Sequence, residues 1–319
     1  MFHQVFSLAF ILSLLLLISC QTAEERLTKR ADKLHSRIMT LDSHTDTPLM
    51  LMREGFDIGQ VNDPHNRGGK LDFPRMKKGG LDAAFFAVFI GQGSLSEEAY
   101  QVAARRADDI FALIHQALEE YPEQAGLALS AEDAYKLKAE GRRAIYIDVE
   151  NEFPMGEDIG MLSRWYEMGA RYLGLSHTRN NQVCDASTDS DGPLHGGLSP
   201  LGVEVVHELN RLGMMVDVSH ISDEAFYDVI RHSRAPVIAS HSNARAVCDH
   251  PRNLDDEMLK ALAENQGVIQ LCILSAYVKE MEPYPARDSA FADLRSRYNN
   301  FEDLSDEDMQ TVRNEWSRL

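Results

Sequence analysis

The sequence predicts an α/β fold of the TIM (β/α)8-barrel type in which the eighth strand is missing. Three observations support this prediction. Seven short apolar runs recur along the chain, amphipathic helical stretches separate them, and 319 residues is a length that suits one large α/β domain or two small ones. The runs are apolar on both faces, which is typical of parallel strands covered by helices. A doubly wound parallel sheet is the alternative fold.

In chain order, the predicted strands are Ile38–Ser43, Ala83–Ile90, Arg143–Val149, Tyr172–Ser176, Met214–Ser219, Pro236–Ser240 and Gly267–Ile273. Two of the intervening helices have clear starts. Ser199 caps a helix whose first residue is Pro200, and Ser222 caps a helix that runs to about Ser233. The other expected helices are Glu97–Tyr121 and Leu254–Asn265.

The amino terminus predicts export and lipid attachment. Residues 1–19 contain no charged side chain, and Phe6–Ile18 is an apolar run shorter than the roughly 20 residues that span a bilayer. Such a run before small residues indicates a signal peptide. The ending Leu-Ile-Ser-Cys20 resembles the bacterial lipobox, which predicts Cys20 as the lipidated first residue of the mature chain. The alternative is an ordinary signal peptide in which Cys20 is incidental.

These features predict a domain organisation and a location. Residues 1–19 form a lipoprotein-type signal peptide, residues 20–36 a tether or first helix, and residues 37–319 an incomplete metallopeptidase barrel domain. The protein would then be an exported lipoprotein, held by its lipid in the membrane of a bacterial cell envelope and facing the periplasm or the cell surface.

The composition narrows the possible partners. Lys and Arg total 32 and Asp and Glu total 50, which gives a net charge of −18. Nucleic acid is excluded as a partner, because a phosphate-binding surface needs clustered Lys and Arg. Four Cys residues in this length do not make a disulfide scaffold. In an oxidising compartment Cys184, Cys248 and Cys272 could pair, although Cys272 sits in an apolar run typical of a buried thiol.

Ligand-type side chains follow five of the seven predicted strands: His44 with Asp46, then Glu150, His177, His220 and His241. In a βα barrel the carboxyl ends of all strands lie on one face, where active sites occur. Imidazole and carboxylate groups suit Zn²⁺, and their number exceeds the three protein ligands of one catalytic zinc. Two metals that share a carboxylate would account for the count and would activate a water for hydrolysis. Each residue taken alone has an ordinary structural explanation; their recurrence at one structural position favours a metal centre.

The residues that carry these ligands resemble the membrane dipeptidase (renal dipeptidase) family of metallopeptidases. The similarity runs from about Arg37 to Ala276. It rests on Asp-Ser-His44-Thr-Asp46-Thr-Pro, on Val-Glu150, on Gly-Ala-Arg-Tyr-Leu-Gly-Leu-Ser-His177, on Asp-Val-Ser-His220, and on Ser-Arg-Ala-Pro-Val-Ile-Ala-Ser-His241-Ser.

The resemblance implies a binuclear zinc dipeptidase on a distorted TIM barrel, with two Zn²⁺ per chain. It implies that His44 and Asp46 bind one zinc, that His220 and His241 bind the other, and that Glu150 bridges them. It also implies that His177 contacts the substrate near the scissile carbonyl. Arg252 would hold the carboxylate of the dipeptide, although without the family it would be read as a surface charge. Members of the family are often homodimers.

The sequence departs from the family after Ile273. A polar, helix-prone tail follows, and the expected eighth strand with its Gly-Ser/Thr-Asp-Phe-Asp-Gly type motif is absent. The general acid–base Asp of the family is therefore absent from this chain, which we interpret as truncated at its carboxyl end. The polar loop Thr178–Leu198 is expected either to shape the substrate cleft or to be a flexible surface loop.

The leading hypothesis is a lipid-anchored metallodipeptidase that hydrolyses dipeptides by a hydroxide bridging two zinc ions. The alternatives are another amidohydrolase-like hydrolase and a non-catalytic lipoprotein that binds metal or peptide.

Overall fold

The computed structural model describes residues 22–66, 69–298, 301 and 304–316. The predicted signal peptide and Cys20 lie outside the described residues. The described residues divide into two compact units, one that ends at Thr40 and one that begins at Leu41. In the first, helix α2 (Ala23–His35) begins at Thr22, which forms a capping box with Glu25. None of the described helices has the length and apolar character needed to cross a membrane.

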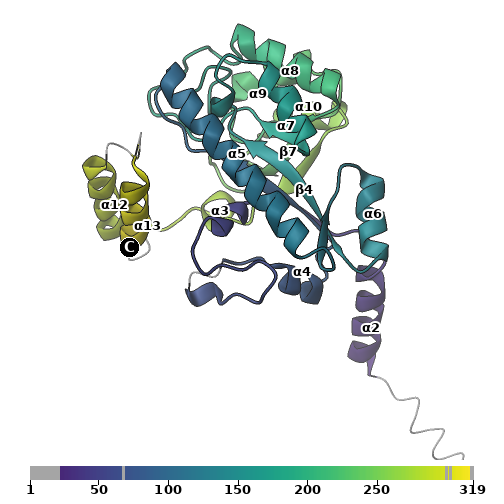
Figure 1. Cartoon of the computed structure of the whole chain (residues 1–319). Coiled ribbons are helices and arrows are strands. Elements are labelled where there is room, and N and C mark those ends of the chain that lie inside the picture. Colours follow the sequence, from purple (N-terminus) through teal and green to yellow (C-terminus); the bar gives the residue numbers. More distant parts are fainter. Residues whose placement is uncertain (1–21, 67–68, 299–300, 302–303, 317–319) are drawn as a thin grey trace, which may run out of the picture. The chain divides into compact units, whose positions relative to one another are not determined.

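The second unit is built around a parallel sheet that curls into a nearly closed barrel (Figure 1). Along its path the strands are β1 (Leu41–Thr45), β2 (Ala83–Phe89), β4 (Arg143–Glu150), β5 (Ala170–Gly174), β6 (Met215–Asp217), β7 (Ile238–Ser242) and β8 (Val268–Leu271). Every pairing along this path is parallel. The prediction of a TIM-like α/β barrel with seven strands is therefore confirmed.

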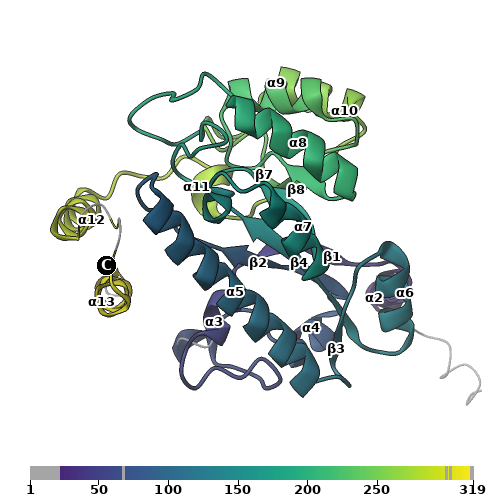
Figure 2. The ribbon, with the colours of Figure 1, turned by 45° about the horizontal axis from the view of Figure 1, so that its top comes forward.

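Helices follow the strands and cover the outside of the sheet (Figure 2). The helices of this unit are α3 (Pro48–Leu51), α4 (Phe73–Gly79), α5 (Glu97–Glu120), α6 (Ala131–Ala139), α7 (Gly160–Glu167), α8 (Pro200–Leu212), α9 (Asp223–His232), α10 (Asp256–Glu264), α11 (Ser275–Val278), α12 (Pro285–Arg297) and α13 (Asp306–Trp316). Two short 3-10 turns, η1 (Pro64–Asn66) and η2 (Phe153–Met155), complete the described elements. The predicted caps Ser199 and Ser222 accept backbone hydrogen bonds at the starts of α8 and α9.

One strand was not predicted. β3 (Ala125–Leu127) pairs with the first three residues of β4, whereas β5 pairs with the last four on the same edge. Three residues that include a glycine are too short to give a periodic apolar signal. β3 thus fills the edge of β4 that β5 does not reach.

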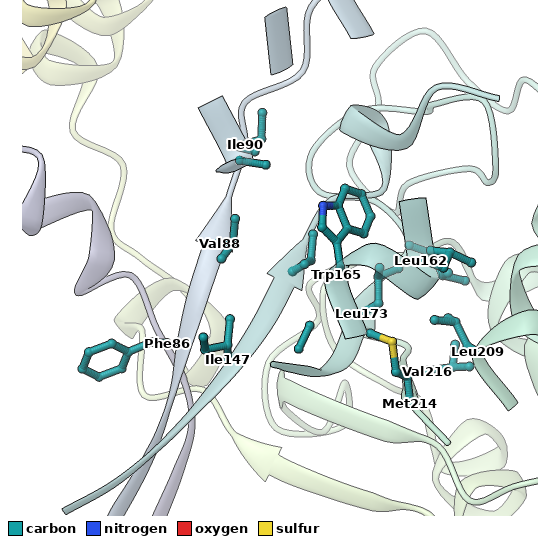
Figure 3. Packing of buried hydrophobic residues seen from close by; sticks show 14 of the residues in the cluster. Phe86, Val88, Ile90, Ile147, Leu162, Trp165, Leu173, Leu209, Met214 and Val216 are labelled. Atoms are coloured by element: carbon teal, nitrogen blue, oxygen red, sulfur yellow. The ribbon is translucent and has the colours of Figure 1, made fainter. Parts of the chain in front are cut away.

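The core lies between the sheet and its outer helices. Trp165 and Leu162 of α7 pack with Leu173 of β5, and Leu209 of α8 packs near Val216 of β6 (Figure 3). These side chains are almost completely buried. The packing fixes the strands from outside and leaves their carboxyl ends free to carry polar groups.

β8 is the exposed edge of the sheet. Val268 and Leu271 are 49% and 75% exposed, and Ile273, two residues beyond the strand, is 90% exposed. Within the part of the chain that the structure describes, no further strand pairs with this edge. The barrel is therefore not sealed between β8 and β1.

A buried carboxyl group gives a testable pH dependence. Glu152 is completely buried in the turn after β4, and neither carboxyl oxygen has a hydrogen-bond partner among the described residues. Burial raises its pKa well above the ordinary 4.5. The folded state therefore binds a proton that the unfolded state releases, so Glu152 lowers stability as the pH rises above about 4.5.

We expect Glu152→Gln to raise the free energy of unfolding at pH 7.5 by about 1–3 kcal/mol, because it removes the ionisable group from this site. At pH 5 the gain should shrink markedly. Denaturant unfolding at both pH values measures it, and a loss of stability of equal size at both would contradict the assignment.

Candidate metal centre

The ligand-type side chains predicted from the sequence meet at the carboxyl ends of the strands. His44 lies in β1, Glu150 is the last residue of β4, and His241 lies in β7. His177 and His220 each come three residues after a strand, β5 and β6. Residues separated by almost two hundred positions in the sequence are thus brought to one face of the barrel.

Two of these strand ends turn through unusual backbone. His220 has φ 73°, and Asn151, directly after Glu150, has φ 78°. Non-glycine residues rarely adopt this left-handed region, and such strain often occurs at functional sites. Asn151 is held in place because its side-chain amide donates to the carbonyl of Ile90 and its backbone N–H donates to Gly174. The two turns direct Glu150 and His220 into the barrel mouth.

Glu150 is the centre of the cluster. One carboxylate oxygen lies 3.1 Å from Nε2 of His220, 3.5 Å from Nε2 of His241 and 4.0 Å from Nε2 of His177. The other lies 3.6 Å from Nε2 of His44. Burial raises the pKa of Glu150, but the facing imidazoles outweigh burial and hold that pKa well below its ordinary value. Glu150 is therefore a buried anion with imidazole nitrogens on both sides.

Hydrogen bonds on the far side of the rings fix which nitrogen faces Glu150. The Nδ1 of His220 lies 3.2 Å from the backbone carbonyl of His177, which can only accept. The Nδ1 of His44 lies 3.1 Å from the hydroxyl of Tyr172, whose proton goes to the carbonyl of Ser43. In both rings Nδ1 must donate, which assigns the inward lone pair to Nε2 of the neutral ring.

His241 is oriented by a relay. Its Nδ1 lies 2.7 Å from the hydroxyl of Ser240, and that hydroxyl donates to the carboxylate of Asp217 at 2.5 Å. Ser240 therefore accepts from Nδ1, and Nε2 of His241 is again the inward lone pair. Burial lowers the pKa of His241 to about 4, and a charged His44 contributes to the shift. His241 is thus neutral at pH 7.

The donor set fits a cation. The Nε2 atoms of His220 and His241 lie only 2.7 Å apart, and the assigned tautomers place a lone pair on each. Two lone pairs this close repel unless a proton or a metal ion lies against both. Four imidazoles around one buried carboxylate are the ligand types that zinc prefers. Burial lowers the pKa of His44, but the carboxylates of Glu150 and Asp148 raise it to about 10 overall.

Glu150 belongs to two groups of possible ligands. One comprises His44, Glu150 and His241, the other Glu150, His177 and His220, and within each group the ligand atoms lie within 4.8 Å of one another. Asp46 belongs to neither: its side chain is 61% exposed, and its nearest oxygen is 3.9 Å from Nε2 of His44. The geometry therefore groups the histidines differently from the two pairs that the resemblance implies, while Glu150 is common to both arrangements.

Arg252 lies beside the cluster and is only 3% exposed. The interpretation of Arg252 as a surface charge, which follows when the family resemblance is left aside, is therefore wrong. Its guanidinium donates to the carbonyl of His241 at 3.2 Å and lies 5.4 Å from the ring of Tyr277. No carboxylate of the described residues forms an ion pair with it, and its Nε has no partner there. Burial lowers the pKa of Arg252.

The loop after His177 is packed rather than loose. The buried carboxylate of Asp185 accepts backbone N–H groups from Leu194 to Gly197, and Asn181 is fully buried. The loop borders a cavity of about 540 Å³ whose other wall includes Ser222 and Arg245.

The sequence model of the family described as Membrane dipeptidase (Peptidase family M19) matches residues 28–312. The chain belongs to this family. Members of this family depend on metal, and the imidazoles around Glu150 form two groups that could hold a metal ion.

Curated relatives match about three quarters of this chain. Dipeptidase aclJ of Aspergillus oryzae is 34% identical over 76% of this chain and 59% of its own length. Dipeptidase 3 of Rattus norvegicus is 33% identical over 79% of this chain and 51% of its own length. The chain thus spans about half to three-fifths of these curated relatives.

A solved relative supports the fold. The probable dipeptidase PvdM from Pseudomonas aeruginosa superposes with a TM-score of 0.76 and is 31% identical, covering 88% of this chain and 70% of that one. The membrane dipeptidase fold predicted from the sequence is therefore confirmed.

The sequence did not reveal the residues that orient the ligands. Tyr172, the Ser240–Asp217 pair and Asp148 all lie behind the imidazoles. A signal for Asp148 was present, because it precedes Glu150 by two residues in one strand and so shares its face. The contacts of Tyr172 and Ser240 depend on pairing between distant strands, which the sequence alone does not specify.

Proposed function

We propose that this chain is a dipeptide hydrolase whose centre binds two zinc ions, with Glu150 shared between them. The observation that carries the proposal is the convergence of inward-facing Nε2 atoms from His44, His220 and His241 on the two oxygens of one buried carboxylate. A single tetrahedral site would leave part of this donor set unused. Asp46, whose nearest oxygen lies 3.9 Å from Nε2 of His44, would be a further ligand of the zinc ion that His44 binds.

Bound zinc would polarise the scissile carbonyl and activate a water for attack. The residues of the chain would hold the cations and the substrate in place. Glu150 supplies the negative charge that holds the cations, and the far-side hydrogen bonds of the imidazoles keep the lone pairs inward. His177, whose side chain is 28% exposed, faces the open side of the cluster and can contact the carbonyl region of a substrate.

Arg252 indicates the class of substrate. A buried guanidinium without a carboxylate partner, next to the metal ligands, fits the free carboxylate at the end of a short peptide. A substrate with that group close to its scissile bond is a dipeptide. The family membership and the names of the relatives support the same class.

The experiment is an activity assay on the full chain after removal of metal and reloading with zinc. We expect hydrolysis of a panel of dipeptides that needs zinc and that survives His207→Ala, which replaces an exposed histidine of α8. Zinc binding without turnover would favour the non-catalytic alternative. Turnover of lactone or phosphoester substrates with no preference for a free carboxylate would favour another hydrolase.

We also propose that the chain is a lipoprotein anchored through Cys20, on the evidence of the apolar run and the Leu-Ile-Ser-Cys20 ending. We expect the wild-type chain expressed in a bacterium to partition with membranes and to incorporate labelled fatty acid. Cys20→Ser should abolish both, because the thiol that would carry the lipid is gone. Equal membrane partitioning and labelling of the Cys20→Ser variant would refute the anchor.

A further inference from the structure

Asp148 is a buried carboxylate without an evident role in the fold. It is completely buried in β4, and neither oxygen has a hydrogen-bond partner among the described residues. A carboxylate in such a place costs stability unless something compensates for its burial. An unsatisfied buried group therefore requires a functional explanation.

The surroundings of Asp148 point to His44. Asp148 pairs in register with Ala87 of β2 on one side and Tyr172 of β5 on the other. The small side chain of Ala87 leaves room, and an oxygen of Asp148 lies 3.7 Å from Nδ1 of His44. The same Nδ1 donates to the hydroxyl of Tyr172 at 3.1 Å. Asp148 is thus the only charged group behind the ring of His44 that the structure describes within ion-pair distance.

We propose that Asp148 is a positioning residue for the metal centre, which holds the His44 ring in place and strengthens Nε2 of His44 as a metal ligand. A carboxylate that faces the outer N–H of a ligating imidazole fixes the ring and raises its basicity. A small rotation of the ring would close 3.7 Å to a hydrogen bond. The inference rests on the proposed zinc site but assigns a residue outside its ligands.

In His220 and His241, the outer nitrogen Nδ1 donates to a group that is not a carboxylate. His241 uses the Ser240–Asp217 relay, and His220 uses the backbone carbonyl of His177. Of these three histidines, only His44 has a carboxylate of the described residues within 4 Å of its outer nitrogen. Removing that carboxylate should therefore weaken the half of the centre that contains His44 and spare the half that contains His220.

The test is zinc titration of the metal-free protein against a chelator of known affinity, with Asp148→Asn compared with the wild type. We expect one of the two zinc affinities to fall by about 10–100-fold, as for other partners behind metal ligands, and the other to be unchanged. Glu152→Gln is the matched control, because it replaces another buried carboxyl group without a hydrogen bond, one that forms no ion pair with an imidazole among the described residues; its zinc affinities should equal those of the wild type.

Two further measurements distinguish a loss of His44 positioning from damage to the fold. Thermal unfolding of the metal-free Asp148→Asn protein should show little change in stability, because the lost contact with His44 is offset by the removal of a buried charge. Tyr172→Phe should lower zinc affinity more in the Asp148→Asn background than in the wild type, because either group can accept from Nδ1. Unchanged affinities in Asp148→Asn would overturn the inference alone, whereas a wild-type chain that binds no zinc would overturn the proposed function.

Discussion

Glu150→Gln is expected to abolish zinc binding and to lower dipeptide hydrolysis by about 10³-fold or more. The substitution keeps the shape of the side chain but removes the one buried negative charge that the imidazoles of His44, His177, His220 and His241 share. Neutral amide groups are poor zinc ligands, and two cations without this anion would repel each other. Elemental analysis after dialysis and a zinc-dependent dipeptidase assay measure the two effects.

The same variant has a readout that does not depend on zinc. Glu150 is the strongest of the groups that raise the pKa of His44 to about 10, so Glu150→Gln should lower that pKa, as NMR titration of the metal-free protein would show. Glu152→Gln makes the same chemical change two residues away and should leave zinc content, activity and the pKa of His44 unaltered. Full zinc content in Glu150→Gln would contradict the shared-carboxylate arrangement.

Arg252→Met is expected to lower kcat/KM for dipeptides by about 10–100-fold. A charge-assisted contact to a carboxylate is worth about 1.5–3 kcal/mol, and every 1.4 kcal/mol is a factor of ten. Methionine fills much of the space of the buried arginine stem, and loss of an unpaired buried charge should not harm the fold. Zinc content should be unchanged, since Arg252 is not among the ligand groups.

The decisive comparison uses a dipeptide and its carboxamide. The wild type should prefer the free acid strongly, and Arg252→Met should lose most of that preference because nothing remains to pair with the carboxylate. Arg252→Lys should fall between them, since it keeps the charge but not the planar fork. If Arg252→Met retained the preference, the carboxylate would have to be recognised elsewhere.

The barrel could be predicted from the sequence because its strands are short runs buried on both faces. β2, for example, is buried along nearly its whole length. Boundaries shifted by a few residues, as for β1, which begins at Leu41 rather than Ile38. β3 could not be found, because its three residues depend on pairing with β4 rather than on a local pattern.

The convergence of the candidate ligands could also be predicted, because strand ends meet on one face in this fold, but their grouping could not. His44 stacks on His241 with ring centroids 4.0 Å apart, a contact between β1 and β7 that no local sequence pattern specifies. The residues that contact the outer nitrogens of these rings could not be predicted for the same reason. Arg252 was identified only through the family, because its burial depends on the loop after β7 folding back onto the ligands.

Diffraction at the zinc absorption edge from crystals of the zinc-loaded chain would locate the ions themselves. We expect two anomalous peaks, one on each side of the Glu150 carboxylate, each within about 2.0–2.2 Å of an oxygen of Glu150 and of inward Nε2 atoms. A single peak would refute the pair of ions. Absence of any peak at Glu150, with zinc elsewhere or nowhere on the chain, would contradict the metal centre itself.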